Sequence, residues 1–111
     1  MPHALMVVLT NAKPGQSERF ESWYDERHLK DLAAVPGITS VRRYGVSPMK
    51  LPAGVEGFES LAIYELEADD IDAVLAECGR RMGTAEMPTD PALDSDRTLA
   101  FVALPKPVAV G

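Results

Sequence analysis

The sequence predicts one domain of the α+β class with its elements in the order βαββαβ. Three observations support this: the chain has 111 residues, apolar residues recur with strand-like and helix-like periods, and turn-forming residues separate these segments. Hydrophobic residues make up 46% of the chain and charged residues 25%, a composition typical of folded globular domains. We therefore expect residues 1–111 to form a single domain around one core.

The first two predicted elements are a strand and a long helix. Residues 3–10 form a β-branched and aliphatic run that ends at turn-forming residues, as expected of a strand. A helix is predicted from Gln16, because aromatic residues spaced three and four apart alternate with polar ones. It must end before Pro36, since proline disfavours a helical conformation in the preceding residue. The aromatic residues that mark this helix are Phe20, Trp23 and Tyr24.

The rest of the chain predicts three strands and a second helix. Residues 38–46 and 58–66 are extended apolar runs, and the prolines and glycine between them favour a hairpin loop. Asp69 is placed to cap a helix that ends at Gly83, and residues 98–104 form the last strand. The apolar stripe of this second helix consists of Ile71, Val74, Leu75, Cys78 and Met82.

This order of elements predicts the ferredoxin-like arrangement, a four-stranded antiparallel sheet with both helices on one face. The strands carry apolar side chains on both alternations, as residues 4–9 illustrate. Helices cover only one face of such a sheet, so the second apolar face needs its own cover. We therefore expect two copies of the chain to pair sheet to sheet as a homodimer.

Composition also excludes several classes of partner. The formal net charge is −6 and no basic stripe occurs, so nucleic acid and anionic membranes are poor partners. The longest apolar run is far shorter than the roughly 20 residues that span a bilayer, and no signal-peptide pattern precedes it, so a cytoplasmic protein is expected. With Cys78 as the only cysteine and just two histidines, we expect no disulfide, no metal and no other cofactor.

The first predicted helix carries polar residues where apolar ones are expected. Tyr24, His28 and Asp31 are spaced i, i+4 and i+7, so they share the stripe that Phe20 begins, whereas Leu29 falls nearly opposite Phe20. Either the helix kinks near His28, or it lines a partly buried polar pocket. A histidine beside a carboxylate in a pocket can act as an acid–base pair, because its ordinary pKa of about 6.5 lies near neutral pH. A surface histidine near a helix end is the alternative interpretation.

Three segments together resemble a known family. They are Trp-Tyr-Asp-Glu-Arg-His-Leu at 23–29, Val-Pro-Gly-Ile at 35–38 followed by Arg-Arg-Tyr at 42–44, and Leu-Ala-Ile-Tyr-Glu-Leu at 61–66. With these segments the chain resembles the EthD-like branch of the dimeric α+β barrel superfamily. The resemblance implies that two sheets close into a barrel across a dimer interface and that each subunit keeps a pocket between its sheet and helices. Relatives include cofactor-free polyketide cyclases, muconolactone isomerases, quinol-type monooxygenases and haem-handling proteins, so the fold narrows the reaction only slightly.

The resemblance also implies candidate site residues. His28 matches the histidine of the family's helix motif, and Tyr24 and Asp31 are its neighbours on the stripe, so these three are the predicted catalytic residues. His3 is similar in placement to a pocket histidine of some cyclase-type relatives, although a frayed terminal residue is the alternative. One such group would take a proton from an acidic carbon while another stabilises the enolate oxygen. The predicted substrate-binding residues are His3, Trp23, Arg42, Tyr44 and Tyr64.

Three further features leave alternatives open. Arg42 and Arg43 are adjacent in a strand, so they point to opposite faces; one can meet the ligand, and a solvated edge or a dimer salt bridge is the alternative. Cys78 lies in an apolar stripe, which favours a small buried side chain over a nucleophile. Pro2 would lead the chain after removal of the initiator methionine, as in the tautomerase superfamily, but residues 23–28 have no counterpart there.

Together these features predict a cofactor-independent lyase, isomerase or cyclase that acts on a small apolar carbonyl, phenolic or polyketide-like compound by histidine-mediated acid–base chemistry. A non-catalytic barrel that binds such a small-molecule ligand and a cofactor-free monooxygenase of an electron-rich phenol are the alternatives. Residues 84–96 form a long polar connection, which predicts a lid over the pocket mouth. A passive surface loop is the other interpretation of this segment.

Overall fold

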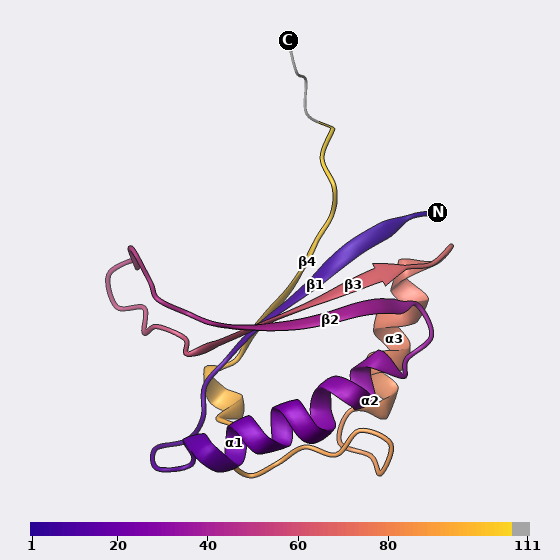
Figure 1. The fold of residues 1–111 in the computed structure, drawn as a ribbon. Coiled ribbons are helices and arrows are strands. Elements are labelled where there is room, and N and C mark those ends of the chain that lie inside the picture. The colour runs from indigo at the N-terminus through magenta and orange to yellow at the C-terminus, as the bar shows by residue number, and fades with distance from the viewer. Residues whose placement is uncertain (108–111) are drawn as a thin grey trace.

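In the computed structural model, residues 1–107 are described, and they form a four-stranded sheet with its helices on one face (Figure 1). The strands are β1 (His3–Thr10), β2 (Ile38–Gly45), β3 (Ser60–Glu67) and β4 (Leu99–Ala103). The helical elements are α1 (Ser17–Trp23), η1 (Tyr24–His28), α2 (Leu29–Ala33), α3 (Ile71–Arg81) and η2 (Ser95–Arg97). The predicted α+β class and element order are therefore confirmed.

The strands lie in the order β2-β3-β1-β4, and every neighbouring pair is antiparallel. Alternate residues of β1, beginning with the buried Ala4, point toward the helices, where they meet buried residues of β3 such as Leu66 and Tyr64. The other alternation, beginning with His3, points to the opposite side. No helix of the described residues covers that side in Figure 1, and we call it the open face.

The core lies between the sheet and the helices. Its aromatic centre comes from α1 and η1 on one side and from β3 on the other, and the connection after α3 adds two fully buried apolar side chains. The residues that fill this core include Phe20, Tyr24, Leu32, Val35, Tyr64, Leu66, Met87 and Ala92. This packing fixes the first helix firmly against the sheet.

The first helix is interrupted by a π-helical turn, Tyr24–His28, which the sequence did not specify. Its buried residues Phe20, Tyr24, His28 and Leu32 recur at every fourth position. On an uninterrupted α-helix each such step would advance about 40° around the axis, so the stripe would rotate away from the core. A π turn holds more residues per turn and offsets part of that advance. The interruption near His28 is therefore a change of helical pitch that keeps a polar stripe buried.

Several predicted boundaries shift by one or two residues, and contacts of two side chains explain two of these shifts. Asp70 rather than Asp69 caps α3, because the Asp70 Oδ1 accepts a hydrogen bond of 3.2 Å from the backbone N–H of Ala73. β3 begins at Ser60, two residues later than predicted. The reason is the buried Asn11 side chain, whose Oδ1 accepts a 2.9 Å hydrogen bond from the backbone N–H of Glu59, so a side chain holds this stretch.

Gly37, which precedes β2, is expected to tolerate no side chain. Its φ of +98° lies in the left-handed region, and an added Cβ would come within 2.5 Å of the Val74 Cγ2 on α3. Backbone strain together with overpacking should make Gly37→Ala destabilising by about 2–4 kcal/mol. Gly15→Ala is the matched control, since Gly15 has a φ of +76° but open space around the added Cβ. Urea unfolding of both variants measures the difference, and equal losses would contradict the packing argument.

Candidate functional site

The structure divides the predicted site residues between the two faces of the sheet. On the helix side lie Trp23, Tyr24, His28 and Tyr64. On the open face lie His3, Arg42 and Tyr44. Adjacent alternations of a strand cannot share one face, so a single chain does not bring His3 and His28 into a common pocket.

Aromatic rings surround His28 on the helix side. The imidazole stacks on the Trp23 ring, with centroids 4.6 Å apart and an interplanar angle of 26°, and it meets the Tyr24 ring edge-on at 5.0 Å. The Tyr24 hydroxyl lies 3.0 Å from the Tyr64 hydroxyl, and both tyrosines are buried. We call these four residues together with Arg43, described below, the His28 cluster.

His28 is held in its neutral form. Only 7% of the residue is exposed, and its Nδ1 is buried without a hydrogen-bond partner among the described residues. Burial lowers the His28 pKa to about 4; the Asp31 charge opposes this shift and the Arg43 charge adds to it. The neutral imidazole has a free ring nitrogen that can accept a proton, but its lowered pKa makes it a weaker base than an exposed histidine.

The two tyrosines are held protonated. Burial raises the pKa of Tyr24 and raises that of Tyr64 still further, while the Arg43 charge opposes the shift at both. The hydroxyls therefore remain hydrogen-bond donors across the neutral range. A protonated hydroxyl in a water-poor site is suited to hold an oxygen atom that gains negative charge.

Asp31, the third predicted catalytic residue, is bound to Arg27 instead of to His28. Its Oδ2 accepts a 2.7 Å hydrogen bond from the Arg27 Nε, and no hydrogen bond joins it to His28 within residues 1–107. Asp31 acts on the imidazole through its charge alone. Asp31, although predicted as a catalytic residue, therefore makes no hydrogen bond that would orient the imidazole.

Arg43, and not the predicted Arg42, is the arginine of the His28 cluster. The Arg43 guanidinium lies over the Tyr24 ring, with its Cζ 4.2 Å from the ring centroid, whereas Arg42 is exposed on the open face. Counting by twos from the buried Ile38 would place Arg42 inward. An irregularity in the pairing of β2 with β3 between Ile38 and Ser40 reverses the alternation of inward and outward side chains. The sequence does not predict this local feature.

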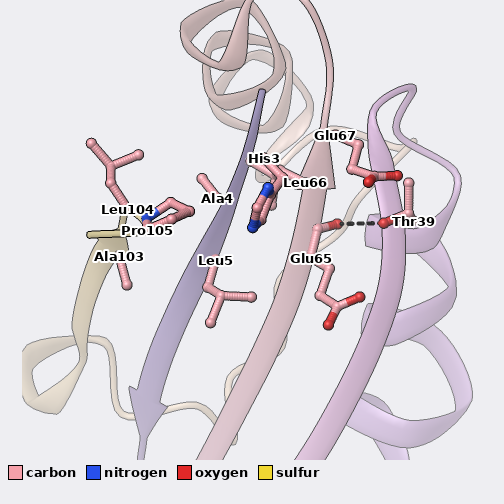
Figure 2. Close-up of a pocket in the computed structure, with 10 residues that line it drawn as sticks. All are labelled: His3, Ala4, Leu5, Thr39, Glu65, Leu66, Glu67, Ala103, Leu104 and Pro105. Carbon is pink, nitrogen blue, oxygen red and sulfur yellow. Dashed lines mark hydrogen bonds between the residues drawn. The ribbon is translucent and has the colours of Figure 1, made fainter. Parts of the chain in front are cut away.

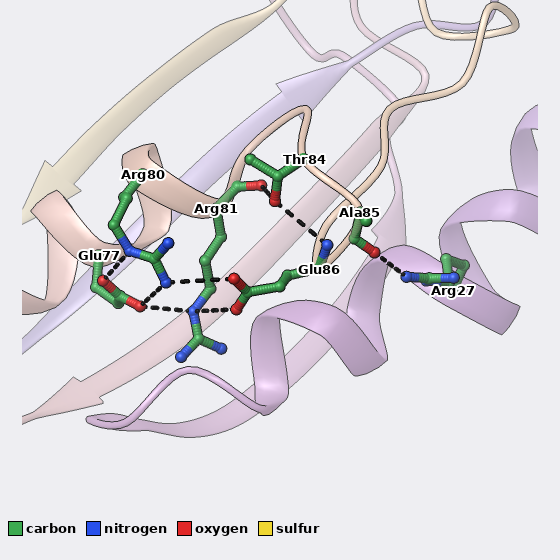
Figure 3. Close-up of polar contacts among 7 residues, drawn as sticks. All are labelled: Arg27, Glu77, Arg80, Arg81, Thr84, Ala85 and Glu86. Carbon is green, nitrogen blue, oxygen red and sulfur yellow. Dashed lines mark hydrogen bonds and ion pairs between the residues drawn. The ribbon is translucent and has the colours of Figure 1, made fainter.

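Residues 84–96 pack against the first helix and α3. The Trp23 Nε1 donates a 3.3 Å hydrogen bond to the Pro88 carbonyl, and the Arg27 guanidinium donates one of 3.0 Å to the Ala85 carbonyl. On the α3 side, Figure 3 shows ion pairs that join the segment to the end of the helix. Glu86 pairs with Arg80 and with Arg81 at 3.5 Å each, and both arginines also pair with Glu77 within α3. The segment thus holds Trp23, which in turn covers His28.

A second candidate site is a pocket of about 500 Å³ on the open face, at the start of β1 (Figure 2). His3, Thr39 and two carboxylates supply its polar groups, and aliphatic side chains supply the rest of its lining. The residues that define it include His3, Leu5, Glu65, Glu67, Leu104 and Pro105. A mixed lining of this kind suits a small molecule with an apolar body and a polar end.

Among residues 1–107 no three His, Cys, Asp or Glu side chains gather so that they could hold a metal ion. Within the same residues, none of the helices has the length and apolar character needed to cross a membrane.

The burial of His28 predicts a pH-dependent stability. The unfolded chain binds a proton at His28 below pH 6.5, but the folded chain does so only below about pH 4. The contribution of His28 to the free energy of unfolding is therefore fully present above pH 6.5. It falls by about 3 kcal/mol in total as the pH drops to 4. His28→Gln removes this part, so the wild type should lose more unfolding free energy than the variant between pH 7 and pH 4. If the unfolding free energies of the wild type and of His28→Gln, measured by urea titration, changed equally between pH 7 and pH 4, the burial of His28 would be contradicted.

Comparison with known proteins bears on the fold. The chain is similar to an ethyl tert-butyl ether D (EthD) family protein from Bacillus halodurans C-125, with 16% sequence identity, a TM-score of 0.59, and coverage of 96% of this chain and 100% of that chain. It is also similar to a dimeric ferredoxin-like protein of unknown function from Thermobifida fusca YX, with 16% identity, a TM-score of 0.44, and coverage of 93% and 91%. No protein-family model and no curated protein matches the sequence. The chain therefore has the ferredoxin-like fold that is also found in an EthD family protein.

Proposed function

We propose that the chain is a cofactor-independent lyase, isomerase or cyclase that transfers a proton within a small, largely apolar carbonyl, phenolic or polyketide-like compound. The observation that carries this proposal is the neutral, buried His28 with an unpartnered Nδ1 beside a pair of protonated tyrosines. An unpaired polar atom in a core is costly, so such an atom at an aromatic-lined site supports a functional role.

In the proposed reaction, His28 takes a proton from a carbon next to a carbonyl group, and the carbonyl oxygen gains negative charge as the enolate forms. The Tyr24 hydroxyl then donates a hydrogen bond to that oxygen, and Tyr64 supports Tyr24 through their mutual hydrogen bond. The positive charge of Arg43 above the Tyr24 ring favours the same anion. The imidazolium of His28 finally returns the proton to another atom of the product.

The proposed chemistry requires access to a side chain that is almost fully buried. Residues 84–96 are the candidate lid, because their carbonyl groups hold Trp23 and Arg27 next to His28. We expect the rate of amide hydrogen exchange in this segment to differ between the free protein and the protein with a bound substrate. If amide exchange throughout residues 84–96 were identical in the free and the bound protein, the proposal that this segment is a lid would be contradicted.

Non-catalytic binding of a small ligand is the second candidate function, and the open-face pocket supports it. That pocket is already formed, whereas the His28 cluster is closed. Binding at the pocket should weaken when Leu5 is replaced by aspartate and should be unaffected by substitution of His28. Catalysis at the His28 cluster predicts the reverse dependence.

Solvent deuterium incorporation is the direct test of the proposed reaction, because proton abstraction alone produces it. A panel of 1,3-dicarbonyl compounds, phenols and short poly-β-ketones is incubated with the protein in D₂O, and exchange at carbon is followed by NMR. The proposal predicts exchange above the buffer rate for at least one compound and its loss in His28→Gln. If deuterium exchange persisted in His28→Gln, another residue would be the general base, and His3 and Pro2 would be the next candidates.

A further inference from the structure

We propose that Arg43 is a positioning residue that holds the π-helical turn Tyr24–His28 in place and thereby fixes His28 against Trp23. This inference rests on the proposed function in one respect only: the position of His28 matters for catalysis if His28 is the base. The structural part of the proposal stands on the contacts of Arg43 alone.

The first observation is that Arg43 spans the junction where α1 passes into the π turn. Its guanidinium binds both carboxylate oxygens of Glu21, at 2.6 and 3.1 Å, and the Asp25 Oδ1 at 2.7 Å. Glu21 belongs to α1 and Asp25 to η1, so one side chain joins the last turn of regular helix to the widened turn. The forked geometry of arginine allows these bonds at once.

The second observation is that the other end of this bridge is fixed in the sheet. Arg43 extends from β2, and its Nη2 donates a 2.6 Å hydrogen bond to the Ser60 Oγ at the start of β3. Only 12% of the Arg43 side chain is exposed, and the guanidinium also lies on the Tyr24 ring. The bridge therefore ties the π turn to two strands and to a core aromatic residue.

The physical consequence follows from the geometry of helices. A π turn is rare and is found mostly as a single inserted turn, so it persists where the surrounding structure holds it. If the turn relaxed to α-helical pitch, the residues that follow would rotate by up to about 100°, the angle of one residue. Such a rotation would carry His28 off the Trp23 ring and out of the core.

The test reads the position of His28 without any substrate. Nuclear Overhauser effects between the ring protons of Trp23 and His28 report the stack, and Trp23 is the only tryptophan in the chain. Two variants release the bridge from opposite ends: Arg43→Gln, and the double variant Glu21→Ala/Asp25→Ala, which removes every helix-side acceptor and whose acids are more than half exposed and so should not be needed for folding. Arg42→Gln is the matched control, because it removes the neighbouring charge from the open face.

We expect both releasing variants to lose the Trp23–His28 cross-peaks and the control to keep them. Retention of these cross-peaks in the double variant would overturn the proposal, even if Arg43→Gln failed to fold. A failure of the proposed function is distinguishable, since it would leave turnover unchanged in His28→Gln while the cross-peaks still disappeared when the bridge was released.

Discussion

Replacement of His28 by glutamine is expected to lower turnover of an identified substrate by about 10²-fold to 10⁴-fold, the usual contribution of a positioned general base. Glutamine is chosen because it fills a similar volume, whereas alanine would leave a cavity beside Trp23 and Tyr24. An unchanged near-ultraviolet circular dichroism spectrum and melting temperature at pH 7 would show that the fold is retained.

Two further substitutions separate the partners of His28. Tyr24→Phe removes the hydroxyl that would hold the enolate oxygen and should also reduce turnover, by roughly the 10²-fold to 10³-fold that one such donor contributes. Asp31→Asn should have a much smaller effect, because Asp31 binds Arg27 and not the imidazole. Normal turnover in His28→Gln, or a larger loss in Asp31→Asn than in Tyr24→Phe, would contradict the proposed assignment.

The element order and part of the core could be predicted because they depend on periodic patterns, whereas Met82 of the predicted stripe is exposed and Met87 and Ala92 of the predicted polar connection are buried. The strand at 3–10 has the bounds found in the structure, and the shared stripe of Phe20, Tyr24 and His28 follows from their four-residue spacing. Such patterns reflect which side chains must leave water, and many residues contribute to each of them. The spacing left both a buried and a surface His28 open, and the structure shows that the residue is buried.

The details that decide the site depend on single backbone irregularities instead. The π turn changes the pitch of one helical turn, and the irregularity near Ser40 exchanges the facing of Arg42 and Arg43. Neither has a residue signature of its own, because each is imposed by contacts between segments far apart in the sequence. The pairing of Arg43 with Glu21 and Asp25 joins positions about twenty residues apart, which no local pattern reveals.

The open face provides the second large expected effect. Apolar side chains of all four strands are partly or substantially exposed there, and 47% of Phe101 and 46% of each of Leu99 and Tyr44 remain accessible. A continuous apolar sheet face of this kind is unusual on a monomer. Strand β4 is also exposed on both faces along most of its length. We therefore expect a homodimer in which two open faces pack together and bury more than roughly 1,000 Å².

Light scattering at micromolar concentration should accordingly give about twice the 12.0 kDa mass of one chain. Phe101→Glu places a charge within the proposed interface and, in a two-fold dimer, introduces it twice, so the variant should be a monomer. Lys30→Glu, on the exposed helix side, is the matched control and should remain dimeric. Because Phe101 is half-exposed in the single chain, its substitution should leave the monomer fold intact, which circular dichroism can verify. A wild-type mass of 12 kDa at this concentration would exclude sheet-to-sheet pairing and leave the open-face pocket accessible to solvent.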